Sequence, residues 1–568
     1  MTRLWGRFQR GGEHVVFAAL VLFVGVLSVL PMGRLLLEGI APGGVFDTAV
    51  LEEVLSARST WRTTGRTLFT AGLGTIVATA LGTAFALAVA LTDVRAKGAL
   101  VFCFMLPLMI PPQITALSWI QLFGPSSPLL NALGLAPPPG TPHPMYSREG
   151  IALLLGIQHS ALVFLAMRAG LRGLPREIVE AARASGAGIA RVLRDVVIPV
   201  MTPALVAGAA LAFVSAVGNF GIPALLGIPA RYTVLPTLIY QRLSSFGPTI
   251  ISEVAVLSII VGLIAFSGVL LQGWMLRRRD YRTIGPASQP LDFRLGSWRP
   301  FVETASWLVI FFILVAPLTA LISTSLVPAY GVTLAPGTAT LDNYVEVLAR
   351  QDATIRAFRN SFFLAGGAAV TLVGVSLVLA YFVTRRRSRI LGALNLAAEL
   401  PYALPGVVLA IAAILIFLKP LPLLGFSIYN TVWIIFAAYL ARFLTLSLRP
   451  VISGYHQLDP TLEEAAQMAG ATLMYRLGTV MMPLLAPIAV AGGIVVFLTA
   501  FNELTVSALL WSSGAETLGV IVFNLDDGGY TTLAAAVAVV AVLVVLLLML
   551  ATQVIARRLP RGVLPWEA

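Results

Sequence analysis

The residues that could do covalent, metal or phosphate chemistry are few and scattered in this chain of 568 residues. The single cysteine, Cys103, lies in an apolar run, and the four histidines show no metal-ligand spacing. A phosphate-binding loop needs Gly-Lys-Ser or Gly-Lys-Thr, but the two lysines, Lys97 and Lys419, precede Gly98 and Pro420. The sequence therefore predicts no catalytic residue, no metal site and no nucleotide-binding site in this chain.

A second pattern, made of one acidic, two small, one glycine and one proline residue, occurs twice. The two copies are Glu180, Ala181, Ala182, Gly186 and Pro199, and Glu464, Ala465, Ala466, Gly470 and Pro483. Each member of the second copy follows its counterpart by 284 residues. One copy alone would fit an amphipathic helix resting on a bilayer, but two copies at the same spacing favour a docking surface for another protein.

Local signals around each copy predict a short helix, a turn and a second short helix. Asp459 is a candidate helix cap, and Pro175 and Pro460 suit a first helical position. The acidic residues of the first turns, Glu177, Glu463 and Glu464, complement the positive end of the helix dipole. The glycine of each copy is expected to end the first short helix, and the small alanines leave a flat face for close approach.

Polar side chains inside apolar segments form a third set. They are Gln113, Ser215 and Asn219 in the first part of the chain and Glu399, Tyr402, Thr499, Asn502 and Glu503 in the second. Two of them, Asn219 and Glu503, are 284 residues apart, as are Gly218 and Asn502. Such residues either line a polar path or hydrogen-bond between helices, and the sequence leaves both interpretations open.

The elements that carry these residues must be membrane helices, because 58% of the chain is hydrophobic and 11% is charged. Its mean hydropathy is +0.90. About 20 apolar residues cross the hydrocarbon layer as a helix. Twelve such segments are predicted, near 14–37, 64–92, 98–122, 150–172, 200–226, 250–275, 302–327, 358–384, 390–418, 427–448, 484–510 and 532–556. The predicted fold is an all-α polytopic membrane protein, since lipid requires internally satisfied backbone groups.

The net charge of +12 comes from short clusters between these segments rather than from one basic face, so it indicates cytoplasmic loops and not nucleic-acid binding. The predicted inside clusters are at 3–10, 95–97, 168–194, 277–279, 385–389, 442–476 and 557–561. This places both termini in the cytoplasm.

The repeat extends through both halves of the chain. Upstream the offset becomes 294, and it pairs Pro107 and Pro111 with Pro401 and Pro405, which should kink the third span of each half. Even span numbers make the halves parallel repeats about an axis along the membrane normal. The predicted division is 1–279 for the first half, 280–300 for a cytoplasmic linker and 301–568 for the second half.

The doubled pattern resembles the EAA motif of permeases of binding-protein-dependent ABC importers, here with tandem fused halves of the type I kind. In that family the motif forms the coupling helix that docks on an ATP-binding subunit. The resemblance implies that the ten residues of the two copies are coupling residues. It also implies two ATP-binding subunits, which use ATP and Mg, and an external solute-binding protein. The chain is then expected in the cytoplasmic (inner) membrane of a prokaryotic cell. No cofactor is expected on this chain itself.

The resemblance also bears on the solute. The stretches 219–226 and 503–510 look most like the ferric-iron permease group, and thiamine and aminoethylphosphonate systems share the fused arrangement. A gradient-driven secondary transporter is the less favoured alternative, because membrane-depth acids are few: Glu253, Glu399 and Glu503. The sequence does not decide among the solutes.

Overall fold

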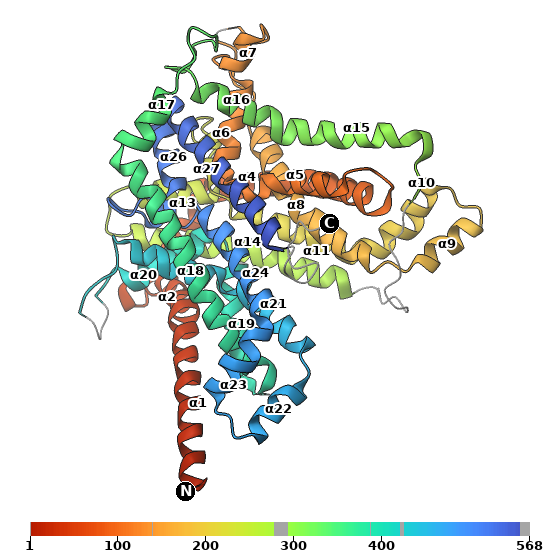
Figure 1. Ribbon diagram of the computed structural model, residues 1–568. Helices are drawn as coiled ribbons and strands as arrows, with labels where there is room; N and C mark the ends of the chain where they lie inside the picture. The colour runs from red at the N-terminus through yellow and green to blue at the C-terminus, as the bar shows by residue number, and fades with distance from the viewer. Residues whose placement is uncertain (1, 139, 278–292, 387, 421–424, 557–568) are drawn as a thin grey trace.

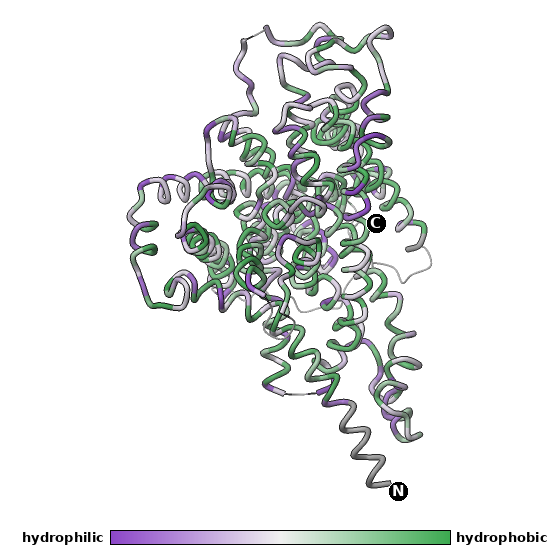
Figure 2. The backbone as a smooth tube through the Cα atoms, turned by 90° about the vertical axis from the view of Figure 1, so that its left-hand side faces the viewer, coloured by the Kyte–Doolittle hydropathy of each residue, from purple (hydrophilic) through white to green (hydrophobic). Residues whose placement is uncertain are grey.

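The computed structural model describes residues 2–138, 140–277, 293–386, 388–420 and 425–556. Within these ranges the regular elements are helices, and one isolated β-bridge joins Thr92 to Phe293. Hydrophobic residues dominate the helices in the body of the molecule, and hydrophilic residues gather in the segments that connect them (Figure 2). The predicted all-α class is confirmed.

The described residues of the first half form fourteen α-helices, and their arrangement is shown in Figure 1. They are α1 Thr2–Val24, α2 Leu30–Ile40, α3 Ala49–Ser56, α4 Arg58–Leu91, α5 Lys97–Met109, α6 Pro112–Phe123, α7 Pro128–Ala132, α8 Arg148–Arg172, α9 Arg176–Ala184, α10 Ile189–Val192, α11 Ile198–Val217, α12 Gly221–Gly227, α13 Leu235–Leu243 and α14 Ile250–Arg277.

The second half repeats this order from the end of the 280–300 segment onward. Its α-helices are α15 Arg299–Ile310, α16 Ala316–Ser325, α17 Asp342–Val345, α18 Asp352–Arg385, α19 Arg389–Ala403, α20 Gly406–Phe417, α21 Val432–Gln457, α22 Pro460–Met468, α23 Leu473–Arg476, α24 Met482–Phe501, α25 Ser507–Leu510, α26 Leu518–Asp527 and α27 Thr531–Ala556. Both α4 and α18 have 34 residues, and α11 and α24 both have 20, so the repeat is one of structure as well as sequence.

Ten helices in the described residues are long and apolar enough to cross a membrane, and two bent pairs raise the number to twelve if each is one span. The bent pairs are the predicted third spans: the axes turn by 100° between α5 and the segment Pro112–Ala132, and by 112° between α19 and α20. Pro111 and Pro405 lie at the breaks in extended conformation, which ends a helix because proline has no N–H and a fixed φ. The predicted discontinuity at these prolines is confirmed.

Each fifth span begins with a wide helical turn. A π-helical segment covers Leu193–Val197 in the first half and Leu477–Met481 in the second, directly before the helix turn that contains Pro199 or Pro483. Because proline cannot donate the bond to the residue four before it, the backbone widens just upstream. The proline of the repeated motif therefore shapes the connection between the motif and the membrane helix.

The first helix of each half packs on the other half. On the second half, Phe17 of α1 lies against Phe382 of α18, with ring centroids 5.8 Å apart. On the first half, Glu303 of α15 accepts a hydrogen bond from the backbone N–H of Arg95 at 2.8 Å. Arg299 lies 3.7 Å from Asp93. Helix α1 of the first half therefore contacts the second half, and helix α15 of the second half contacts the first.

Two predictions are changed or limited by the structure. The inside loop expected from Arg442 is wrong at its start, because α21 continues as a helix through Arg442 to Gln457. Residues 278–292, most of the predicted 280–300 linker, and the basic tail 557–561 lie outside the described residues. The end of the linker is bound to the first half, since Phe293 N–H donates to Leu91 O at 2.7 Å and Leu295 N–H to Asp93 Oδ1 at 3.0 Å. The division into 1–279, 280–300 and 301–568 stays a prediction.

Candidate functional site

The first copy of the repeated motif forms α9, a tight turn and α10, as predicted. Glu180, Ala181 and Gly186 are exposed, and Ala182 is half-buried. Glu180 lies 2.5 Å from Arg176, one helical turn earlier. Pro175 is the residue before the helix rather than its first residue, in extended conformation. The segment is fixed from below by Val179, which is fully buried.

The second copy forms α22, the same turn and α23. Pro460 is the first helical residue, and Asp459 Oδ1 accepts a hydrogen bond from the N–H of Thr461 at 2.9 Å, so the predicted cap is confirmed. That hydrogen bond holds the pKa of Asp459 below its usual range. Glu464, Ala465 and Gly470 are exposed and Ala466 is half-buried.

Both motif glycines adopt the left-handed conformation that ends a helix, with φ of +84° at Gly186 and +81° at Gly470. The N–H of the following residue, Ala187 or Ala471, donates to the carbonyl of Ala182 or Ala466 at 3.1 Å. This closing pattern satisfies the last carbonyls of the short helix and favours glycine, since a side chain there costs about 1–2 kcal/mol. The predicted role of the two glycines in the turn is confirmed.

The two motif segments project from the body of the molecule in different directions. In Figure 1, α9 with α10 and α22 with α23 project to the right and to the bottom, away from α7 and α17 at the upper left. Glu180 and Ala181 of the first segment and Glu464 and Ala465 of the second are exposed, so these positions are not covered by the rest of the described chain. The two segments are therefore separate exposed surfaces.

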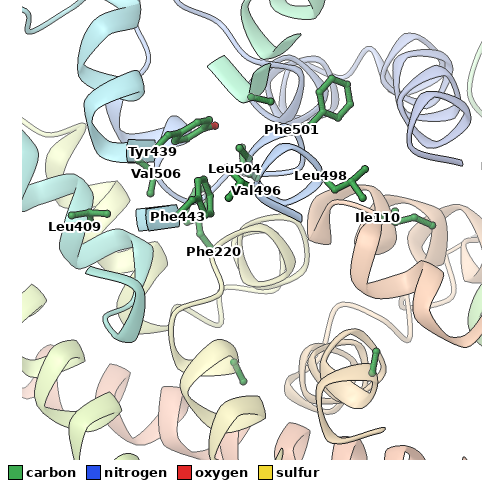
Figure 3. Close-up of a cluster of buried hydrophobic side chains, with 14 of the residues drawn as sticks. Ile110, Phe220, Leu409, Tyr439, Phe443, Val496, Leu498, Phe501, Leu504 and Val506 are labelled. Atoms are coloured by element: carbon green, nitrogen blue, oxygen red, sulfur yellow. The ribbon is translucent and has the colours of Figure 1, made fainter. Parts of the chain in front are cut away.

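The halves meet at the other ends of the fifth spans. A Cβ at Gly218 would lie 2.9 Å from the side chain of Pro405 in the opposite half. Asn502, its counterpart, donates a hydrogen bond to the carbonyl of Met109 in the first half. The buried apolar cluster here combines Phe220 with Tyr439, Phe443, Leu504 and Val506 (Figure 3). These contacts close the space between the halves at this level.

Asn219 and Glu503 make equivalent hydrogen bonds at this closure. Asn219 Oδ1 accepts the N–H of Ile222 at 3.1 Å, and Glu503 Oε2 accepts the N–H of Val506 at 2.9 Å. Each side chain thereby holds the start of the short helix that follows, α12 or α25. The local hydrogen bonds support the helix-shaping interpretation for these two atoms, while Glu503 has a further oxygen that faces Arg442 at 3.8 Å.

Gln113 differs from them, because its amide is fully buried and neither Oε1 nor Nε2 has a hydrogen-bond partner among the described residues. Gln113 lies between the halves. A Cβ added at Gly221 of the first half would lie 3.3 Å from its Oε1, and a Cβ added at Gly519 of the second half would lie 3.0 Å from its Nε2. A buried amide without partners is costly, which favours a role in another arrangement of the halves.

The remaining path candidates lie along the same helices, further from this closure. Thr499 donates to the carbonyl of Val495 at 2.7 Å within α24, and Ser215 is half-buried in α11. Glu399 lies on α19, 2.7 Å from Arg449 of α21, and Tyr402 on the same helix is 44% exposed. The structure thus brings Gln113, Asn219, Asn502 and Glu503 together at the closure and leaves the other four along its approach.

Sequence reasoning missed Arg442 and Arg449 as members of the site. They were assigned to a loop by charge alone, yet both lie within α21. The sequence signal that could have identified them is an arginine within an apolar helix. Placing its charge in lipid is costly, so such a residue is typical of a polar path.

A polytopic helical subunit with two like halves, each carrying an exposed EAA segment, is a permease of the ABC importer class. The chain belongs to the family described as binding-protein-dependent transport system inner membrane component, whose model matches residues 78–281 and again 371–564. It is a multi-pass inner-membrane transport subunit.

Comparison with individual proteins agrees with the family. The "probable ABC transporter permease protein y4fN" of Sinorhizobium fredii is 28% identical over 99% of this chain and 98% of its own length. The ferric transport system permease protein FbpB of Actinobacillus pleuropneumoniae is 24% identical over 92% of this chain and 76% of its own. A chain of a bacterial ABC importer of alginate is 19% identical, with a TM-score of 0.38, over 46% of this chain and 96% of its own.

Proposed function

We propose that this permease moves a solute delivered by an external binding protein, driven by two ATP-binding subunits that dock on α9 and α22. The observation that carries the proposal is the pair of exposed EAA segments, each ending in a left-handed glycine. The ATP-binding subunits would use ATP and Mg, and both termini of this chain would lie on their side, in the cytoplasm. The coupling residues are the ten motif positions at 180–182, 186, 199, 464–466, 470 and 483.

Transport then requires the closure between the halves to open. We place Gln113, Asn219, Asn502 and Glu503 at the gate and Ser215, Glu399, Tyr402 and Thr499 along the solute path. The unsatisfied amide of Gln113 supports this placement, since opening would give it water or solute as a partner. ATP binding must favour one arrangement of the halves over the other for the cycle to run.

Ferric iron is the first solute to test, because FbpB, a permease named for ferric transport, is similar along most of the chain. A second candidate is 2-aminoethylphosphonate: the PhnV permease of Salmonella typhi, named for its transport, is 28% identical over 45% of this chain and 94% of its own.

The test of the coupling proposal is co-purification from detergent with valine variants of the two glycines. Gly186→Val with Gly470→Val should lose the bound ATPase and about tenfold or more of transport, because a β-branched residue at positive φ deforms the docking turn.

Gly188→Val is the matched control, since this glycine lies in the same segment at φ −68° with open space around it. Co-purification of the ATPase with the control but not with the double variant supports the proposal. An ATPase that binds both equally, or gradient-driven uptake by the chain alone in liposomes, would overturn it.

A further inference from the structure

Helix α21 carries two arginines on one face at membrane depth. Arg442 and Arg449 are seven residues apart, which is two helical turns, so both project from the same side. Each meets a carboxylate from another element. Arg449 Nη2 lies 2.7 Å from Glu399 Oε2 of α19, and Arg442 Nε lies 3.8 Å from Glu503 Oε1 after α24.

In both pairs the cation is the more accessible partner. The side chain of Arg449 is 64% exposed and that of Glu399 is 22%; the values for Arg442 and Glu503 are 22% and 6%. Nη1 of Arg442 has no hydrogen-bond acceptor in the described part of the chain. The acids therefore hold both arginines in place. The side chain of Arg449 is largely exposed, whereas Nη1 of Arg442 is buried.

We expect the face of α21 that carries these arginines to contact water rather than lipid. An exposed guanidinium eight residues before the end of a membrane helix would be costly against hydrocarbon. The neighbouring face of α19 is polar as well, with Asn395, Glu399 and Tyr402 at helical spacing, and Asn395 Nδ2 donates to Glu399 Oε1 at 3.2 Å. Two polar helix faces in contact are expected to line an aqueous route.

The first half has no counterpart of this face. The equivalents of Arg442 and Arg449 are Gln158 and Leu165, at the offset of 284. The equivalents of the α19 face, at the offset of 294, are the apolar residues Val101, Met105 and Leu108. These equivalent positions are thus uncharged in the first half, where α8 instead has the buried Arg168 one turn beyond Leu165.

Room for one guanidinium is provided by a glycine. A Cβ at Gly406, the first residue of α20, would lie 2.3 Å from Nη1 of Arg442, closer than any contact allows. The break between α19 and α20 therefore places an open backbone position directly beside the arginine. The sequence at this break is fitted to the side chain.

We propose that the Arg442–Arg449 face contacts the solute in transit, and that the solute presents anionic oxygen atoms. Guanidinium groups bind such oxygens with paired, charge-assisted hydrogen bonds. The class includes an oxyanion or phosphonate and also a ferric ion held in an anionic chelate, and it excludes a bare hydrated cation. The inference rests on the proposed permease function.

The sign of charge along the route can be measured without knowing the solute. In a Cys103→Ser background, which removes the single cysteine of the chain, Tyr402→Cys places a thiol on the α19 face. Its reaction with the negatively charged sulfonatoethyl methanethiosulfonate is compared with that of the positively charged trimethylammonioethyl reagent. Each rate is normalised to the reaction of a free thiol in water.

The anionic reagent should react faster than the cationic one by about tenfold, since a charged cleft concentrates counter-ions. Arg449→Gln should lower that ratio and Glu399→Gln should raise it. A faster cationic reagent, or a thiol that reacts with neither, would overturn the inference, because the route would then favour cations or the face would contact lipid.

Uptake into cells distinguishes the two sources of anionic oxygen. Radiolabelled ferric citrate and 2-aminoethylphosphonate are offered to cells with the wild-type chain, Arg449→Gln, Arg449→Lys and Glu399→Gln. Whichever solute is imported, Arg449→Gln should reduce its uptake about tenfold, Arg449→Lys should retain part of it, and Glu399→Gln should reduce it least. The reverse order of the Gln variants would overturn the inference.

Co-purification of the ATPase with each variant separates the two proposals. If no ATPase binds the wild-type chain, the permease mechanism fails while the reagent ratio still reports the charge of the face. If the ATPase binds and the ratio favours cations, only the inference about the solute fails.

Discussion

On the buried side of α22, Glu463 lies among polar partners, whereas the equivalent buried residue of α9 is Val179. These buried sides are called the second base and the first base. Glu463 Oε1 accepts a hydrogen bond from the hydroxyl of Tyr381 at 2.6 Å. Its carboxylate also lies 3.4 Å from Nε of Arg385 and 3.7 Å from Nε of Arg476. The equivalents of these partners in the first half, by the two repeat offsets, are Leu87, Leu91 and Val192.

The exposed faces of the two segments also differ, but here the first segment is the more charged one. The first segment buries valines and exposes charged residues: Arg176, Glu177, Glu180, Arg183, Arg191 and Arg194. The second buries its ion pairs and exposes apolar residues: Leu462, Met468, Met474 and Tyr475. The same backbone is therefore supported by apolar packing in one half and by paired charges in the other, and it offers chemically different surfaces to its partners. Two identical partner subunits would have to bind both surfaces.

The largest effect is expected from breaking the buried ion pairs of the second segment. Arg476→Met leaves Glu463 in a buried site with half of its cationic partners, and the free energy of unfolding should fall by about 3 kcal/mol. Val192→Ala, at the equivalent position, removes two methyl groups from an apolar site and should cost about 2 kcal/mol. Thermal unfolding in detergent measures both.

Transplanting the first-half residues is the matched control for that experiment. In an Arg385→Leu background, Glu463→Val, Arg476→Val and Tyr381→Leu together replace the network by the side chains of the first half. Stability should return to within about 1 kcal/mol of the wild type, because well-packed apolar groups often replace buried ions without loss. A triple variant less stable than Arg476→Met alone would show that the two bases are not interchangeable.

How far the sequence could predict this comparison depends on the range of the interactions. The helix, turn and glycine of each segment follow from residues within one short stretch, and so do the proline breaks of the third spans. The position of Glu463 in the first turn suggested a role at the helix dipole, which is incomplete. Its partner Tyr381 lies 82 residues away in the chain, so local pattern carries no sign of the contact.

The pairs of α21 show the same limit. Arg442 and Arg449 were visible as charges beyond an apolar run, but only the packing of α19, α20 and α24 around α21 shows which acids they meet. The repeat did carry one usable signal, because aligning the halves sets Arg442 against Gln158 and Glu503 against Asn219. Residue differences at aligned positions of an internal repeat indicate where the two halves differ in function. They do not show which side chains these residues contact.

The smallest effect on the free energy of unfolding is expected at Glu13. This residue lies on α1 and connects the second base to the first half. Glu13 pairs with Arg386 and lies 3.8 Å from Arg476, and the arginine it shares with Glu463 makes it part of the same network. Arg386 is half exposed, so Glu13→Gln should cost no more than about 1 kcal/mol.

The change at Glu13 should instead be visible locally. Hydrogen–deuterium exchange at 460–476 should become faster in Glu13→Gln and stay unchanged at 176–192, because nothing in the first base depends on this carboxylate. Glu303→Gln is the reciprocal control, since Glu303 supports the turn after α4 in the first half through Arg95 and Arg299. High salt should reduce the difference between wild type and Glu13→Gln by screening the exposed pair. Equal acceleration of both segments by either variant would mean that the first helices hold the halves together as one unit, and the contrast between the two bases would then lie only in their static packing.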